Sequence, residues 1–284
     1  MTKPLRTAAF FTFALILLVA APGQLCFGQT QTNTQTQPAP QTKPSKPAPD
    51  LNNLDFPSDT WHVAVSPYLW MAGLDADITI VGRTAQVNQS FGDIFSNLKF
   101  GIMGVTEIRR GRIGFLTDMM WIKLGDETSI PVANLNNTLD VKSSLNSFTL
   151  TPYFAYRMFG NEHGAVDALG GVRYYHAGTE IDAEVQNVGK QTVATTDNWV
   201  DVIAGGRFRV NLTPKLHAMF IGDAGGGGSL LSWQIVGGAG YKISQRWDLD
   251  LAYRRLYYNR PTSATSGLEQ TQQGLVLGAT FQIK

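Results

Sequence analysis

Apolar and polar side chains alternate with a period of two along most of the chain from Asp59 to its end. In the segment 274–283, GLVLGATFQI, one set of alternate positions carries Leu, Leu, Ala, Phe and Ile, and the other carries Gly, Val, Gly, Thr and Gln. Comparable alternation recurs over 61–71, 147–157, 166–174, 200–210, 233–243 and 247–254, and less cleanly over 99–109 and 112–124. Because successive side chains of a strand point to opposite faces, each segment predicts a β-strand with one apolar and one polar face.

The connections between these segments are alternately short and long. Tight breaks are expected at Arg110-Gly111, 160–164, 211–214 and 244–246, whereas longer polar stretches occupy 72–98, 125–141, 178–195 and 259–269. Short turns at one end and long loops at the other are typical of transmembrane barrels. The pattern therefore predicts an all-β fold, an antiparallel transmembrane β-barrel of about ten strands, with eight or twelve as alternatives.

Residues 72–98 contain two features that bear on this count. Segments 76–81 and 84–87 resemble a hairpin around Gly82, which either extends the first two strands or adds two more. Ser90 then precedes apolar residues at 91, 94, 95 and 98, which is a helical spacing with a suitable N-cap. We expect a short helix near 90–98, at the rim of the barrel or inside its mouth.

Residues 1–28 have the pattern of a signal peptide. Lys3 and Arg6 precede an apolar run over 8–21 that is shorter than the ~20 residues of a spanning helix. We place cleavage before Gln29; lipidation of Cys26 and a retained membrane anchor are the alternatives.

Residues 29–58 are rich in Gln, Thr and Pro and lack large apolar side chains over most of their length. Such a segment buries too little surface to offset its ordering entropy, so it predicts a disordered tether. The expected organisation is a signal peptide over 1–28, a tether over 29–58 and a barrel over 59–284.

Charge and cysteine content narrow the function classes. The chain has 23 Lys and Arg against 22 Asp and Glu, so it lacks the basic excess of a nucleic-acid-binding protein. Its one cysteine, Cys26, lies within the predicted signal peptide. The mature protein is therefore expected to contain no disulfide bond.

The signal peptide, the alternating strands over 61–283 and the terminal strand GLVLGATFQIK together resemble the small bacterial outer-membrane β-barrels of the OmpA-like and OmpW-like group. The segments PYLWMAGLDADITIVG, FGDIFSNLKF and MGVTEIRRGRIGF also resemble a poorly characterised set of exported barrels that open with a Pro-Tyr-Leu-Trp strand. The resemblance implies a bacterial outer-membrane location with a periplasmic tether. It also implies two kinds of partner, outer-membrane lipid or lipopolysaccharide and the barrel-assembly machinery, and leaves the oligomeric state open. The chain departs from the group at Lys284, where an aromatic residue usually ends the barrel.

If the apolar faces contact lipid, the opposite faces line the lumen. We predict a lumen-lining charged network of Glu107, Arg109, Asp118, Arg157, Asp167, Arg173, Asp201, Arg207, Arg209, Asp223, Lys242, Asp248, Asp250 and Arg254, with His217 on the same face. Because the signs are balanced and buried charges require partners, a salt-bridge network that fills the interior is favoured over a small-solute pore.

Aromatic residues near the segment ends predict the two membrane interfaces. The predicted interface aromatics are Trp61, Trp121, Tyr156, Tyr174, Trp233, Tyr241, Trp247 and Tyr253, and the same position near segment ends groups Tyr153, Tyr257 and Tyr258 with them.

Candidate chemistry is sparse. The histidines are His62, His163, His176 and His217, and the acidic string Glu180, Asp182 and Glu184 follows His176. This arrangement could support acid–base chemistry, but no nucleophile elbow, HExxH motif, EF-hand loop or phosphate-binding glycine loop is present. We therefore expect no catalytic, cofactor-binding or metal-binding residues.

The sequence as a whole favours a structural, non-enzymatic envelope barrel. A small-solute pore, a binding module that uses the loops 72–98, 125–141 and 178–195, and an outer-membrane hydrolase are the alternatives.

Overall fold

The computed structural model of the chain describes residues 59–132, 137–185 and 189–283. The predicted signal peptide, 1–28, and tether, 29–58, lie outside these residues. The chain divides into two units, Met1–Ala48 and Pro49–Lys284, and the described residues all belong to the second.

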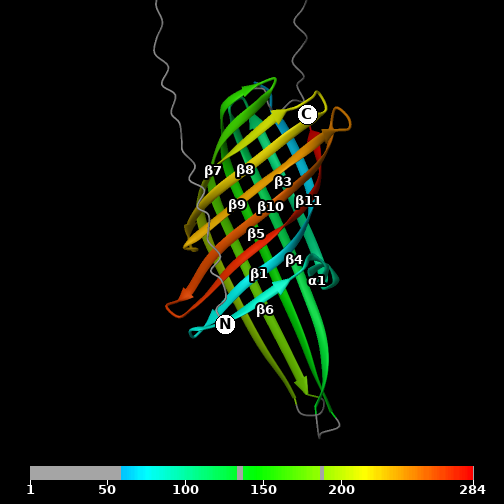
Figure 1. The fold of residues 1–284 in the computed structure, drawn as a ribbon, viewed down its shortest axis with the longest axis vertical. Coiled ribbons are helices and arrows are strands. Elements are labelled where there is room, and N and C mark those ends of the chain that lie inside the picture. Colours follow the sequence, from blue (N-terminus) through cyan, green and yellow to red (C-terminus); the bar gives the residue numbers. More distant parts are fainter. Residues whose placement is uncertain (1–58, 133–136, 186–188, 284) are drawn as a thin grey trace, which may run out of the picture. The chain divides into compact units, whose positions relative to one another are not determined.

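The described residues form one antiparallel β-sheet that closes on itself (Figure 1). Its elements are β1 (His62–Ile80), β2 (Arg83–Gln89), α1 (Phe91–Ser96), β3 (Leu98–Arg110), β4 (Ile113–Val132), β5 (Asn137–Asn161), β6 (Gly164–Val185), β7 (Gly189–Asn211), β8 (Leu216–Gly227), β9 (Leu231–Lys242), β10 (Trp247–Ser263) and β11 (Ser266–Ile283). Strand β1 pairs with β11 from Val63↔Ile283 to Thr79↔Gly267, and this pairing closes the wall. The predicted all-β fold, an antiparallel barrel with ten strands in its wall, is confirmed.

The two faces of the wall differ in polarity, as the alternation predicts. On β10, Trp247, Leu249 and Leu251 are about half exposed, whereas Asp248 between them is 5% exposed. A water-soluble protein places its apolar side chains inside; here the exposed face is the apolar one. This inverted arrangement fits a wall whose outer face contacts lipid.

One end of the barrel carries the tight turns that the sequence predicts. β3 passes to β4 through Arg110–Ile113, and β5, β7 and β9 each reach the next strand within a few residues. Gly111 has φ +57°, a conformation that a residue without a Cβ adopts at little cost. We call this end, with its turns near 111, 162, 213 and 245, the tight-turn end.

At the opposite end, the prediction of long loops over 125–141 and 178–195 is wrong. β4 and β5 stay paired as far as Val132↔Asn137, and β6 and β7 as far as Val185↔Gly189. Beyond the apolar band both faces of a strand meet water, so the alternation disappears although the chain remains extended. β4, β5, β6 and β7 consequently extend past the other strands at the lower end of Figure 1. We call this part of the wall, residues 125–132, 137–145, 178–185 and 189–197, the projection.

The polar stretch 259–269 is also mostly strand, because β10 and β11 pair as far as Ser263↔Ser266. The apparent hairpin around Gly82 extends the first strand. β2 pairs with the outer half of β1, from Leu74↔Gln89 to Ile80↔Arg83, and the described residues give it no other partner. β2 therefore adds an eleventh strand to the sheet while ten strands make the wall.

The predicted short helix is present as α1. Ser90 Oγ accepts a hydrogen bond from the Asp93 amide (3.2 Å), and Asp93 Oδ2 accepts one from the Ser90 amide (2.9 Å). This reciprocal capping box fixes the start of the helix. α1 lies against β1 and β2 and buries none of its residues, so it is a rim element and does not plug the lumen. No helix in the described part of the chain is long and apolar enough to cross a membrane.

Candidate functional site: the barrel interior

Nearest the tight-turn end, the interior holds a cluster of three arginines and two carboxylates. Arg207 donates to Glu107 Oε2 (2.7 Å) and to Asp167 Oδ2 (2.6 Å). Arg109 donates to the same two carboxylates, at 3.0 and 3.1 Å, and Arg157 donates to Asp167. Strand register explains the arrangement, because Asp167 on β6 lies directly opposite Arg157 on β5 and Arg207 on β7. We call these five residues the Asp167 cluster.

A second cluster lies farther along the same strands and is built around Arg173. Its guanidinium donates to Asp223 Oδ1 (2.8 Å), Tyr153 Oη (3.1 Å) and Ser232 Oγ (3.1 Å). Tyr153 in turn donates to Asp223 Oδ2 (2.7 Å), and Gln234 donates to the same oxygen (2.7 Å). Arg173 is 0% exposed, so the network fills the space that its strands enclose. We call these residues the Arg173 cluster.

A third group holds Arg254 on the β10 side of the interior. Arg254 donates to Asp118 Oδ2 (2.8 Å), and Tyr68 donates to Asp118 Oδ1 (2.7 Å). The Arg254 guanidinium lies 4.8 Å from the centroid of the Trp70 ring. Trp70 also belongs to a small buried cluster with Met120 and Leu256.

Toward the projection, an aromatic layer covers these charged groups. Tyr175, Trp199 and Tyr258 have ring centroids 4.7 to 5.5 Å apart. Arg260 lies 5.3 Å from the Trp199 ring centroid, makes a two-point ion pair with Asp197 (3.1 Å for each contact) and donates to the Gly228 carbonyl (2.6 Å). This layer ties β6, β7 and β10 to the β8–β9 turn across the interior.

The remaining predicted interior charges line the tight-turn end or the wall. Asp250 accepts a hydrogen bond from Thr280 (2.7 Å) and lies 3.7 Å from His217 Nε2, while Asp248 accepts one from Gln282 (3.3 Å). Asp201 is fully buried and accepts the Ser229 amide (2.7 Å). Lys242 lies opposite Asp248 in register, and Arg209 follows Arg207 by two residues on the same face. All fourteen predicted lumen residues therefore face inward, in several separate groups.

Several residues of the network are missing from the sequence-based prediction. Tyr153 and Tyr258, grouped by their position with the interface aromatics, face the interior, as do Tyr68, Trp199 and Gln234. The sequence does indicate the inward position of all of these residues except Tyr68. Each lies an even number of residues from a predicted interior charge on its own strand, as Tyr153 does from Arg157, and therefore faces the same side. The aromatic character of Tyr153, Trp199 and Tyr258 concealed this parity.

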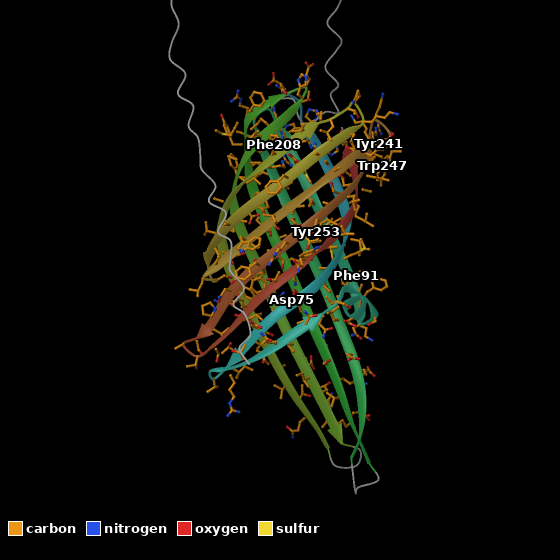
Figure 2. The ribbon with its side chains drawn as sticks, viewed as in Figure 1. Asp75, Phe91, Phe208, Tyr241, Trp247 and Tyr253 are labelled. Carbon is orange, nitrogen blue, oxygen red and sulfur yellow. The ribbon has the colours of Figure 1, made fainter. Side chains whose placement is uncertain are left out.

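The eight predicted interface aromatics all lie on the outward face. Trp61, Trp121, Tyr156, Tyr241, Trp247 and Tyr253 are between 36% and 57% exposed, and Tyr174 and Trp233 are partly covered by neighbouring side chains. Tyr241 and Trp247 lie close to the tight-turn end, and Tyr253 lies farther along the wall (Figure 2). The outward aromatics thus lie at different heights on the wall.

The histidines are placed without a catalytic arrangement around them. His176 points outward and contacts Asn146 (3.3 Å) and Asn198 (2.7 Å), two amides. Near His217, the Asp250 carboxylate stands between the imidazole and the hydroxyl of Thr280, which is not the nucleophile–imidazole–carboxylate order of a triad. His62 lies at the start of β1 and His163 in an exposed turn.

The acidic string after His176 lies on the outward face of the projection. Asp182 accepts hydrogen bonds from Thr192 (2.6 Å) and Lys190 (2.9 Å). The hydrogen bond from the Lys190 ammonium and that from Thr192 hold the pKa of the Asp182 carboxyl below its ordinary value. Among the residues that the structure describes, no group of three or more His, Cys, Asp and Glu side chains is arranged to hold a metal ion.

Neither a protein-family model nor a curated protein matches the chain. Among solved structures, the outer membrane protease OmpT from Escherichia coli matches with a TM-score of 0.43 and 9% identity, over 81% of this chain and 99% of that one. The translocator domain of the autotransporter NalP from Neisseria meningitidis matches with a TM-score of 0.39 and 12% identity, over 78% of this chain and 88% of that one. Ail, the attachment invasion locus protein of Yersinia pestis, in complex with a heparin analogue, matches with a TM-score of 0.33 and 12% identity, over 78% of this chain and 98% of that one.

Proposed function

We propose that this protein is a closed, non-enzymatic structural barrel of the bacterial outer membrane, with its projection outside the cell and its N-terminal segment in the periplasm. The observation that carries the proposal is the set of buried arginines inside the wall. Arg109, Arg157 and Arg173 are each at most 2% exposed, and all three donate to groups on other strands. An interior filled in this way supports a barrel that does not conduct solutes.

The ion clusters also explain how the barrel holds its shape without a conventional core. An isolated buried charge is expensive, whereas a charge that is paired and fully hydrogen-bonded is tolerated. Each cluster reaches beyond adjacent strands: the Asp167 cluster links β3 to β5, β6 and β7, and the Arg173 cluster links β5 and β6 to β8 and β9. The proposed role of the network is thus to brace the wall from inside.

The same geometry supports a non-enzymatic role over an outer-membrane hydrolase. Inside the barrel, the hydroxyl groups of Ser232 and Tyr175 contact each other, and Ser232 also accepts from Arg173. Among the described residues, no histidine hydrogen-bonds to either hydroxyl, whereas a hydrolase of the serine type requires a general base at the nucleophile. These two hydroxyls therefore serve as hydrogen-bond partners of other interior groups and lack a histidine base among the described residues.

Reconstitution into planar bilayers tests the proposal. The wild-type protein is expected to give no discrete conductance steps at neutral pH. The variant Arg109→Ala/Arg157→Ala/Arg173→Ala, which removes three buried side chains from two clusters, is expected to conduct once its β-content and heat-dependent gel mobility show that it has folded. Discrete steps from the wild-type protein would overturn the closed barrel in favour of a small-solute pore.

A further inference from the structure

A hollow of about 500 Å³ lies on the wall where the projection begins, over β3, β4, β5 and β6. Three of its lining residues are lysines, Lys99, Lys123 and Lys142, and Asn146 lies among them. The hollow is on the outward side of the barrel, since Trp121, two residues from Lys123 on the same face, is 36% exposed. We call it the lysine groove.

An aromatic belt borders the lysine groove on the side of the apolar band. Phe100, Trp121, Phe148 and Tyr174, on four successive strands, follow one another with ring centroids 5.1, 6.5 and 6.2 Å apart. Trp121 Nε1 donates to Asn146 Oδ1 (2.8 Å), so the belt joins the polar lining directly. Aromatic residues with one apolar and one polar edge mark the headgroup level of a bilayer. The groove consequently lies at the height of lipid headgroups.

The two lysines nearest the belt have no acidic partner in the described residues. The Lys123 ammonium lies 5.1 Å from the Trp121 ring centroid, directly beside the belt. The Lys99 side chain lies over Gly125. A Cβ at position 125 would be only 3.0 Å from Lys99 Cε, so the glycine provides the space for this side chain. Neither lysine makes an ion pair with a described residue, whereas Lys142 pairs with Glu127 (3.4 Å).

Carboxylates also line the groove, but they lie farther from the belt. Register places Lys123 beside Asn146, Gly125 beside Ser144 and Glu180, and Glu127 beside Lys142 and Asp182, in successive rows away from the membrane. Glu127 and Asp182 already pair with Lys142 and Lys190. An anion that approaches along the belt therefore meets Lys123 and Asn146 first. Lys99 reaches the next row at Gly125 on β4, and Glu180 stands in that same row two strands away, on β6.

We propose that the lysine groove binds the phosphorylated sugar headgroup of lipopolysaccharide, with the acyl chains lying along the aromatic belt. Two ammonium groups and an amide suit a phosphate monoester, which carries close to two negative charges and three acceptor oxygens. The apolar edges of the belt suit the acyl chains of the same molecule. This inference rests on the proposed outer-membrane location, with the projection on the outside.

Native mass spectrometry of the purified full chain in detergent, titrated with lipopolysaccharide, tests the groove. Wild-type protein is expected to retain bound lipid, and Lys99→Gln/Lys123→Gln to bind it at least about tenfold more weakly, since each lost charge-assisted contact is worth about one decade of affinity. The matched control is Arg112→Gln/Lys215→Gln, which removes the same charge from two exposed positions at the tight-turn end, outside the groove lining. It is expected to bind as the wild type does.

Two further arms identify the phosphate and its source. Lipopolysaccharide stripped of its phosphates is expected to bind wild type and Lys99→Gln/Lys123→Gln equally weakly. Millimolar inorganic phosphate is expected not to displace the lipid. Equal binding of intact lipid to both double variants, undiminished binding of the dephosphorylated lipid, or displacement by free phosphate would each overturn the proposal. Because these measurements are made in detergent, their result is independent of whether the barrel conducts.

Discussion

Arg173 on β6 and Asp223 on β8 make an ion pair of 2.8 Å, across the intervening strand β7, with neither side chain exposed. Arg173→Ala would leave a buried carboxylate with only Tyr153 and Gln234 as partners. Loss of one member of a buried pair typically costs about 3–5 kcal/mol. We therefore expect the free energy of unfolding, measured by urea titration in lipid vesicles, to fall by about that amount.

The double variant Arg173→Met/Asp223→Leu distinguishes the contribution of the ion pair from the cost of leaving one of its charges buried without a partner. Replacement of both partners by apolar residues of similar size is often close to neutral, so this variant is expected to be more stable than Arg173→Ala. Arg112→Ala, at an exposed turn residue, is the control and should change stability by less than about 0.5 kcal/mol. A small effect for Arg173→Ala, similar to that of the control, would refute the bracing role.

Adjacent glycines on β6 offer a test of how closely the strands approach. A Cβ at Gly171 would clash with the Pro152 carbonyl oxygen, whereas a Cβ at Gly170 meets nothing within 4 Å. Gly171→Ala is expected to destabilise the barrel by about 1–3 kcal/mol, the range for overpacking. Gly170→Ala should stay within about 0.5 kcal/mol of wild type in the same urea titration. Equal effects of the two changes would contradict the strand positions.

The pairing of Asp182 with Lys190 makes the projection sensitive to acid. Because the folded pKa of Asp182 is lowered by its hydrogen bonds to Lys190 and Thr192, its stabilising contribution is present above the ordinary carboxyl pKa. That contribution is lost as the pH falls through the lowered, folded value. We expect amides of β6 and β7 in the projection to lose protection against hydrogen exchange as the pH falls below the ordinary carboxyl pKa of about 4, after correction for the intrinsic exchange rate. Lys190→Gln should reduce this pH dependence. If exchange protection in that variant changes with pH as it does in the wild type, the pH dependence comes from other carboxyl groups.

The capping box at Ser90 governs α1 alone. Ser90→Ala removes the acceptor of the Asp93 amide, and an N-cap is typically worth about 1 kcal/mol. Exchange of the amides of Asp93 and Ile94 is therefore expected to accelerate about fivefold, while the amides of β6 keep their rates. Ser96→Ala, at a serine of the last turn of the same helix, is the control. Faster exchange throughout the wall would show that α1 is coupled to the barrel.

Protease accessibility tests the orientation of the barrel. A cleavage site inserted after Ala264, in the β10–β11 turn on the side of the projection, is expected to be cut on intact cells. The same site inserted after Gly111, in the β3–β4 turn, is expected to be cut only after the outer membrane is made permeable. The reverse result would place the tight turns outside the cell.

Sequence periodicity predicts the wall and its inward charges because the membrane imposes opposite polarities on the two faces of each strand. Where that constraint ends, the prediction is wrong: residues 178–195 have water on both sides and lose their alternation, although most of them are paired strand. The sequence also does not predict which charged residues form ion pairs with one another inside the lumen. That Asp167 accepts from three arginines depends on the shear of the strands around the barrel, which no single segment encodes.

The projection changes the aggregation hazard of the protein. A closed wall has no unpaired strand edge, yet β4 beyond Gly125 pairs only with β5, and β7 before Val200 pairs only with β6, among the described residues. Two open edges therefore reappear where the barrel leaves the bilayer, and each is a template on which another extended chain could add. Charged residues stand at both, Asp126 and Glu127 on one edge and Lys190 and Asp197 on the other. The hydration of such charged side chains disfavours the burial of either edge against another strand, which is how natural sheets limit edge-to-edge pairing.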